Sequence, residues 1–228
     1  MKKIIVTLIL CSLTIACFFI IHTVYQRLVD EELGKEKGKV AKDIDKIVDK
    51  EVSEEDVKEV DEGVSEVVGK ELDRYKDIVV YSNGKNYSKS YGKHFSENSY
   101  YYGRKWQCVE YVKRFYYDAL NHKMPELYGN ATDFFDESVP QGGLNKQRDL
   151  LQYRNGGDVK PEQDDLLVFN DSKYGHVAII SKVEEDSIEV VQQNVRGKSR
   201  EEFVLSNSNG TWTVGKKKKP AGWLRIKN

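Results

Sequence analysis

The stretch GRKWQCVEYVKRF, residues 103–115, decides the fold of this chain. Gly103 permits a turn, and apolar side chains then recur at the spacing of one helix face: Val109, Val112, Tyr116 and Ala119. Cys108 therefore falls in the first turn of a predicted helix. Free backbone N–H groups and the positive end of the helix dipole there favour a thiolate, and they can also face a developing oxyanion. The alternative is that Cys108 is a small buried hydrophobic residue.

A thiol nucleophile needs a partner that accepts and returns protons, and histidine is the first candidate. Beyond residue 29 the histidines are His94, His122 and His176. His94 lies in a polar stretch and His122 follows the end of the predicted helix, so we expect both to face solvent. His176 opens the apolar run 177–180, which predicts the start of a buried strand paired with residues 165–169. His176 is therefore the predicted general base.

The imidazole also needs an acceptor that fixes its orientation. The next predicted strand, residues 187–195, carries Gln192 and Asn194, which share a face if side chains alternate throughout. Either amide oxygen can accept the imidazole N–H, although an uncharged amide stabilises an imidazolium less than a carboxylate does. The alternative is that the two residues are a polar pair on an edge strand.

Four blocks in this order carry a resemblance to a known family: GxxWQCVEY at 103–111, GHVAII at 175–180, QQNV at 192–195 and GWL at 222–224. Residues 78–228 resemble the CHAP family of cysteine, histidine-dependent amidohydrolases and peptidases. Within it they are similar to the amidase domains of glutathionylspermidine synthetases/amidases. The resemblance implies an α+β, papain-like cysteine hydrolase fold, in which a helix bearing the cysteine packs on an antiparallel sheet bearing the histidine.

The resemblance also implies residue roles. Cys108 is the nucleophile that forms an acyl-thioester, His176 is the general base and later the acid, and Gln192 is the third member, with Asn194 retained. Family members commonly have Glu where this chain has Gln192, which predicts a lower rate or a shifted pH optimum. Three further residues are candidate oxyanion or substrate contacts: Gln107, Trp106 and Tyr102. Core packing is the alternative for the tyrosine.

The amino-terminal region, residues 1–29, predicts a membrane anchor. Residues 4–25 contain no charged side chain and follow Lys2 and Lys3, and about 20 apolar residues cross a bilayer core. The positive-inside rule then places the amino terminus in the cytoplasm and the remaining chain outside a single-pass cell membrane anchor. The alternative is a signal peptide cleaved after Ala16 and a secreted protein.

Residues 30–77 predict an acidic helical stalk. Apolar residues recur at spacings of three and four: Val40, Ile44, Ile47, Val57, Val60, Val64, Val67, Leu72 and Tyr75. Such a stripe can pair with a second copy as a coiled coil, so self-association through the stalk is a predicted interaction. The alternative is a solvated linker, because Gly63 and Gly69 interrupt the pattern.

Charge and composition limit the possible partners. The formal net charge is −1, divided into +3 for residues 1–29, −7 for residues 30–76 and +3 for the remainder. This balance argues against a polyanion-binding protein, so we expect no nucleic-acid partner. The sequence has no zinc-ligand spacing, glycine-rich phosphate loop or acidic calcium loop, which predicts neither a metal nor another cofactor.

An exported thiol hydrolase of this kind predicts peptidoglycan, or another peptide or amide, as its substrate. Two alternatives stay open. One is an amidase of the glutathionylspermidine type. The other is a catalytically weak module that binds the cell wall, to which the basic run 216–219 would contribute; a solvated loop is the alternative for that run.

Overall fold

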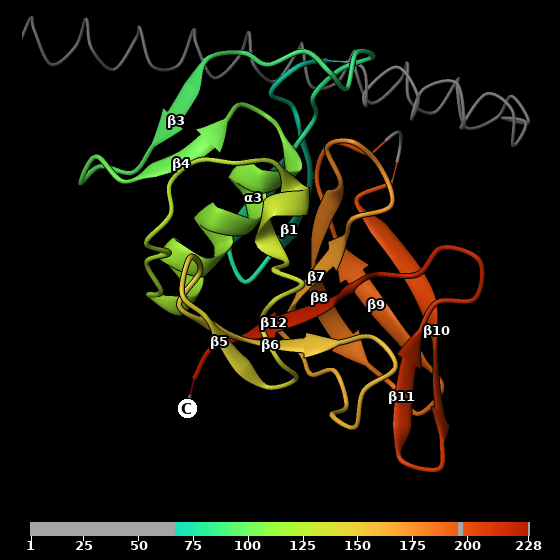
Figure 1. Cartoon of the computed structure of the whole chain (residues 1–228). Coiled ribbons are helices and arrows are strands. Elements are labelled where there is room, and N and C mark those ends of the chain that lie inside the picture. Colours follow the sequence, from blue (N-terminus) through green and yellow to red (C-terminus); the bar gives the residue numbers. More distant parts are fainter. Residues whose placement is uncertain (1–66, 196–197, 228) are drawn as a thin grey trace, which may run out of the picture. The chain divides into compact units, whose positions relative to one another are not determined.

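The computed structural model describes residues 67–195 and 198–227 (Figure 1). The predicted anchor, residues 1–29, and most of the predicted stalk lie outside these residues. Within the described ranges, no helix combines the length and the apolar character needed to cross a membrane.

The described region is α+β and is built around one large antiparallel sheet. Its eight strands lie in the order β11-β10-β9-β8-β7-β12-β6-β5. Their bounds are β5 Gly143–Asn145, β6 Leu150–Arg154, β7 Leu166–Phe169, β8 His176–Val183, β9 Ser187–Val191, β10 Arg200–Ser208, β11 Thr211–Val214 and β12 Gly222–Arg225. The predicted strands at 165–169 and from His176 onward are confirmed as β7 and β8, which pair antiparallel.

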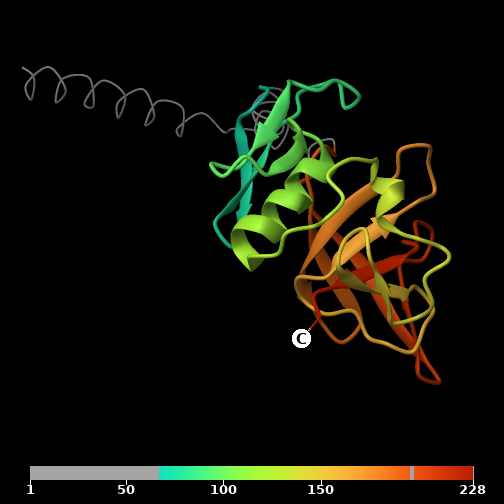
Figure 2. The same cartoon turned by 60° about the vertical axis from the view of Figure 1, so that its left-hand side comes forward.

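The helix α3 spans Cys108–Arg114 and begins at the predicted nucleophile. It continues as a single π-helical turn, η1, Phe115–Ala119, and a short 3-10 helix, η2, follows at Ala131–Phe134. Figure 2 shows α3 between the large sheet and the amino-terminal strands. Those strands are β1 Glu71–Tyr75, β2 Ile78–Tyr81, β3 Lys93–Phe95 and β4 Tyr101–Arg104.

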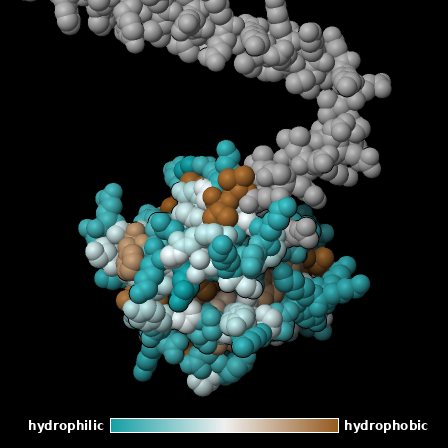
Figure 3. All heavy atoms as spheres, turned by 90° about the horizontal axis from the view of Figure 1, so that it is seen from above, coloured by the Kyte–Doolittle hydropathy of each residue, from teal (hydrophilic) through white to brown (hydrophobic). Residues whose placement is uncertain are grey.

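The sheet buries apolar side chains on both faces because its central strands alternate between two cores. On the helix side, Val177 and Ile179 of β8 pack with Tyr111 of α3. On the far side, Ala178 and Ile180 pack with the fully buried Trp223. Hydrophilic side chains dominate the face seen in Figure 3, where apolar ones form small separate groups. The two-sided burial holds the first residue of β8, His176, on a rigid strand.

The first hairpin contradicts one part of the stalk prediction. Glu71–Tyr75 forms β1, which pairs with β2, whereas the apolar spacing predicts helix through Leu72 and Tyr75. Both residues of the connecting turn, Lys76 and Asp77, have positive φ angles of 45° and 64°, as a tight hairpin turn requires. The Tyr75 ring stacks on Phe115 at 5.5 Å. Packing against η1 therefore decides this segment, and the folded domain begins before residue 78.

Candidate active site

Cys108 lies at the junction between α3 and the large sheet. It is buried, and it is a free cysteine. The backbone N–H groups of Cys108, Val109 and Val177 face its sulfur. Val177 directly follows His176 in β8, so the start of the helix and the start of the strand meet at this thiol. The structure thus brings together the two elements that carry the predicted nucleophile and the predicted base.

The protonation of Cys108 differs from the expectation. Burial raises the pKa of the Cys108 thiol above its ordinary value, and the three backbone N–H groups oppose that shift only in part. The N–H groups at the helix start therefore act in the expected direction, but the burial of the thiol outweighs them. The physical reason is that the thiol is withdrawn from water, which disfavours its charged form. A neutral thiol needs a neighbouring base before it can attack.

His176 is oriented by a hydrogen bond to Gln192. Its Nε2 lies 2.9 Å from the Gln192 Oε1, which can only accept a hydrogen bond. In the neutral ring the proton therefore sits on Nε2, and Nδ1 carries the lone pair. Withdrawal of the ring from water lowers the pKa of His176 to about 4, although the Gln192 hydrogen bond raises it. Above that pH the ring is neutral and able to accept a proton.

Gln192 lies one residue beyond β9 and is buried. Its Nε2 donates to the Glu201 Oε2 at 3.1 Å and to the Lys198 carbonyl at 3.4 Å. The structure thus places Gln192 where the sequence predicts the third member of the site. Its catalytic role, like those of Cys108 and His176, stays a prediction.

Asn194 does not share the direction of Gln192. Strand β9 ends at Val191, and Asn194 has a φ of 66°, so strand alternation does not extend to it. Its Nδ2 donates to the Gln107 Oε1 at 2.8 Å, and its Oδ1 accepts from the Asn83 Nδ2 at 2.8 Å. The expectation of a shared face is therefore wrong. Asn194 holds the residue that precedes the nucleophile and is not the acceptor for His176.

The side chain of Gln107 is used within the protein. Its Nε2 donates to the carbonyls of Tyr87 at 3.2 Å and Lys89 at 2.7 Å. An amide nitrogen has two N–H groups, and both have acceptors here. Both N–H groups of the Gln107 amide are therefore used within the domain, and its contact with an oxyanion or a substrate stays a prediction.

The aromatic candidates pack within the domain. The Trp106 ring lies 4.1 Å from that of Tyr81 and 5.3 Å from that of His94. Tyr102 is buried, and its hydroxyl donates to the Asp118 Oδ1 at 2.7 Å. Asp118 lies in η1, beyond the opposite end of α3 from the thiol. Tyr102 therefore packs within the domain as the alternative states, and its contact with a substrate stays a prediction.

Glu110 is a central residue that the sequence argument did not single out. Its fully buried carboxylate accepts hydrogen bonds from Arg114 Nε at 2.6 Å, His94 Nδ1 at 2.8 Å and Gln193 Nε2 at 2.7 Å. Burial alone would raise the pKa of Glu110, but these hydrogen bonds hold it below its usual value. The sequence signal that could have revealed it is an acidic residue two positions after Cys108, on the face of α3 that is buried.

The other two histidines are not free in solvent as expected. His94 is half-buried in its bond to Glu110. His122 is half-buried too, and its Nε2 lies 2.9 Å from the Arg148 carbonyl. Both have structural partners in the domain, and His176 remains the histidine whose strand reaches Cys108, through the backbone N–H of Val177.

The basic run 216–219 forms an exposed loop between β11 and β12, as the solvated-loop alternative states. One of its residues nevertheless reaches the site. The Lys218 Nζ lies 3.6 Å from the Glu201 Oε2 and 4.5 Å from the centre of the Phe169 ring. Its positive charge adds to the lowering of the His176 pKa.

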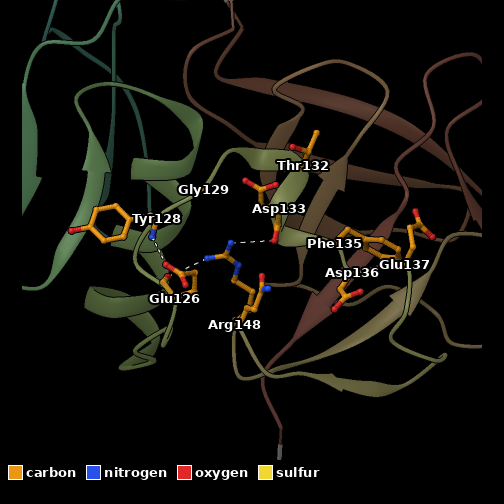
Figure 4. A pocket seen from close by; sticks show the side chains of 10 residues that line it. Glu126, Tyr128, Gly129, Thr132, Asp133, Phe135, Asp136, Glu137 and Arg148 are labelled. Carbon is orange, nitrogen blue, oxygen red and sulfur yellow. Dashed lines mark hydrogen bonds between the residues drawn. The ribbon is translucent and has the colours of Figure 1, made fainter.

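A pocket of about 590 Å³ adjoins the segment that leads into β8 (Figure 4). The backbone N–H of Thr132, on its wall, donates to the Tyr174 carbonyl at 3.2 Å, two residues before His176. The Arg148 guanidinium donates to the carbonyls of Glu126 and Asp133, both at 3.1 Å. Its lining is Glu126, Tyr128, Gly129, Thr132, Asp133, Phe135, Asp136, Glu137, Gln147 and Arg148. Arg148 thus ties together the loops that form the wall.

A free thiol at the first residue of a helix, and an imidazole held by an amide oxygen at the first residue of a neighbouring strand, are the groups that the sequence predicts for a cysteine hydrolase with a neutral third residue. Residues 99–194 match the family model of the CHAP domain, a domain of amidases and peptidases. This match confirms the resemblance carried by the blocks at 103–111 and 175–180 and by residues 192–194, and the large antiparallel sheet with helix α3 is consistent with it.

One curated relative matches over a longer stretch. The chain is 27% identical over 145 residues to trypanothione synthetase of Crithidia fasciculata. The aligned region covers 60% of this chain and 22% of that protein. The chain therefore spans about a fifth of the relative it matches.

Among the residues that the structure describes, no group of three or more His, Cys, Asp or Glu side chains is placed to hold a metal ion.

Proposed function

We propose that this protein is a cysteine-dependent amidohydrolase or peptidase. One observation carries the proposal: the amide N–H of Val177 faces the Cys108 sulfur, while the adjacent His176 is held by Gln192 through its Nε2. This arrangement leaves the Nδ1 lone pair as the proton acceptor of the site. It supplies a nucleophile, a base and fixed backbone donors, which are the parts that acyl transfer requires.

The chemistry follows from these parts. His176 takes the thiol proton as the sulfur attacks the carbonyl carbon of the scissile amide. Backbone N–H groups at the start of α3 stabilise the oxyanion, and the imidazolium then gives its proton to the leaving amine. Water, activated by the same imidazole, hydrolyses the acyl-thioester and restores the thiol. Because the third residue is a neutral amide, the imidazolium receives less stabilisation than a carboxylate would provide.

The substrate we propose is the peptide part of peptidoglycan. Its support is the sequence of residues 1–29, which predicts an anchor that holds the domain outside the cell membrane, where this amide-rich polymer lies. The anchor and self-association through the stalk stay predictions. The second candidate is a conjugate of the glutathionylspermidine type, which the resemblance of the sequence blocks favours.

The test uses the full chain as wild type, Cys108→Ala and Cys108→Ser. Each is incubated with purified peptidoglycan and with glutathionylspermidine, and new amines are identified by mass spectrometry. We expect release by the wild type alone, from peptidoglycan. Release only from the conjugate would establish the second candidate. Retained binding to the insoluble wall, without release from either substrate, would show a binding module instead.

A further inference from the structure

A charged residue lies behind the third member of the site. The Glu201 Oε2 accepts a hydrogen bond from the Gln192 Nε2 at 3.1 Å. Glu201 belongs to β10, which pairs antiparallel with β9, and the backbone N–H of Gln192 donates to the Ser199 carbonyl at 2.9 Å. Ser199 is therefore the residue opposite Gln192, and Glu201 lies two residues further along the chain. Such diagonal neighbours on one face of a sheet lie within reach of long side chains.

This contact determines which way the Gln192 amide points. A carboxylate only accepts hydrogen bonds, and the second neighbour, the Lys198 carbonyl at 3.4 Å, also only accepts. Both require the NH₂ group of Gln192 on their side. The Oε1 is then directed at the His176 Nε2, 2.9 Å away.

The amide direction in turn determines the tautomer of His176. An oxygen at Nε2 requires the ring proton to be on Nε2, which leaves Nδ1 free to take the thiol proton. A flipped amide would present N–H to Nε2 and favour the proton on Nδ1. That tautomer cannot accept a proton from Cys108 through Nδ1, so the attack would lose its base.

We propose that Glu201 is a positioning residue of this site, which holds the Gln192 amide in the direction that keeps the His176 Nδ1 unprotonated. The proposal rests on the proposed function, whose catalytic groups it serves. Glu201 also provides a negative charge one hydrogen bond further from the imidazole than a carboxylate at position 192 would provide.

The charges around His176 agree with this role. The groups that act on the ring are Glu201 of β10, Asp171 in the turn before β8 and Lys218 in the loop after β11. Lys218 lies 3.6 Å from Glu201, so it partly neutralises the carboxylate and also acts directly on the ring. Glu201 alone among the three bonds to the residue that bonds the imidazole.

The experiment compares the full chain as wild type, Glu201→Ala, Glu201→Gln and the control Glu202→Ala. Glu202 is the next residue of β10 and is exposed. Two readouts are measured: kcat and KM on the substrate found active, and the tautomer of His176 from the ¹⁵N chemical shifts of the selectively labelled imidazole. Thermal melting establishes that each variant is folded.

For Glu201→Ala we expect kcat to fall roughly tenfold with KM nearly unchanged, as for a lost hydrogen bond to a charged group. The Nδ1–H tautomer should increase. Glu201→Gln should recover most of both readouts, because its carbonyl can accept the same bond, and Glu202→Ala should match the wild type.

A Glu201→Ala variant that equals Glu202→Ala in both kcat and tautomer would overturn the proposal. If Glu201→Ala does not fold, Glu201→Met replaces it, because methionine has nearly the length of glutamate but no oxygen that can accept the Gln192 bond; equality of Glu201→Met with Glu202→Ala in both readouts would then overturn the proposal. If the wild type hydrolyses nothing, the proposed function fails, and the tautomer measurement still tests the positioning role alone.

Discussion

The Nε2 of His176 lies 2.9 Å from the Oε1 of Gln192, and this amide is itself bonded to Glu201. The imidazole is thus held by a neutral group with a carboxylate behind it. Withdrawal of the ring from water lowers the pKa of His176 to about 4. Burial likewise raises the pKa of the Cys108 thiol, so both groups are neutral at neutral pH, and the proposed mechanism begins with a proton transfer between them.

Placing a carboxylate at position 192 should not restore a charged third member by itself. In Gln192→Glu the new carboxylate would lie about as close to Glu201 as the present 3.1 Å contact. Two carboxylates at that distance share one proton because like charges disfavour double ionisation. We expect little gain in kcat/KM from the single variant.

The double variant Gln192→Glu/Glu201→Gln removes that repulsion. It leaves one carboxylate beside the imidazole, so it should raise the pKa of His176, move the acidic limb of kcat/KM to higher pH and increase kcat roughly tenfold. The comparison is a pH–rate profile of the wild type, both single variants and the double variant. Equal gains from Gln192→Glu and the double variant would contradict the coupling between positions 192 and 201.

The pH dependence of the wild type should reflect the lowered pKa of His176. The base acts when neutral, and its pKa of about 4 lies below the ordinary value of 6.5. Activity should therefore persist as the pH falls through 6.5 and should decline only near pH 4. An acidic limb of kcat/KM centred near 6.5 would show that the ring is not withdrawn from water in solution.

Lys218→Met should move the acidic limb of kcat/KM to higher pH. Lys218 lowers the pKa of His176, and it also lies 3.6 Å from the Glu201 carboxylate. Its removal takes away a repelling cation and leaves the negative charge of Glu201 without this neighbour, so both effects raise the pKa of His176. Lys216→Met, in the same exposed loop, is the matched control. Identical pH profiles for the two variants would argue against an electrostatic role for Lys218.

The sequence predicts the residues at the centre of the site because their signals are local. Helical spacing after Gly103 places Cys108 at a helix start, and an apolar run places His176 at a strand start; both positions are confirmed. The hydrogen bond of Gln192 follows because it directly succeeds β9. In each case one element, read from a few neighbouring residues, determines where the side chain lies.

The parts that the sequence argument missed depend on long-range pairing. The contact of Glu201 with Gln192 requires the register of β9 on β10, and the direction of Asn194 depends on the strand ending at Val191. The stripe that includes Tyr75 fits a helix as well as the strand β1, until packing on Phe115 is known. Spacing along the chain does not contain this information.

Glu110→Ala should strongly destabilise the domain. The carboxylate is fully buried and is 2.6 Å from the Arg114 Nε, so its removal leaves a buried guanidinium without its charged partner. Breaking one side of a buried ion pair costs about 3–5 kcal/mol in the free energy of unfolding. The control is Glu71→Ala, which breaks an exposed pair with Arg74 and should cost at most about 1 kcal/mol. Urea unfolding measures both, and equal losses would contradict a central role for Glu110.

Gly175→Ala should impair catalysis through the position of the next residue, His176. Gly175 has a φ of 67°, and an added Cβ would lie 2.6 Å from the Phe169 carbonyl oxygen and 2.7 Å from the Thr132 nitrogen. Both are backbone atoms, so the start of β8 must shift. A displacement of about 1 Å at a catalytic group can reduce the rate roughly a hundredfold.

The matched control is Gly210→Ala, where φ is 85° but no atom lies within 4 Å of an added Cβ. In Gly210→Ala the left-handed backbone of the alanine should cost about 1–2 kcal/mol in the free energy of unfolding, with no clash and no change in kcat. Steady-state kinetics and urea unfolding of the two variants separate backbone strain from displacement. A Gly175→Ala variant that lost no more stability than Gly210→Ala and kept its kcat would contradict the prediction that the close approach of η2 to Gly175 positions His176.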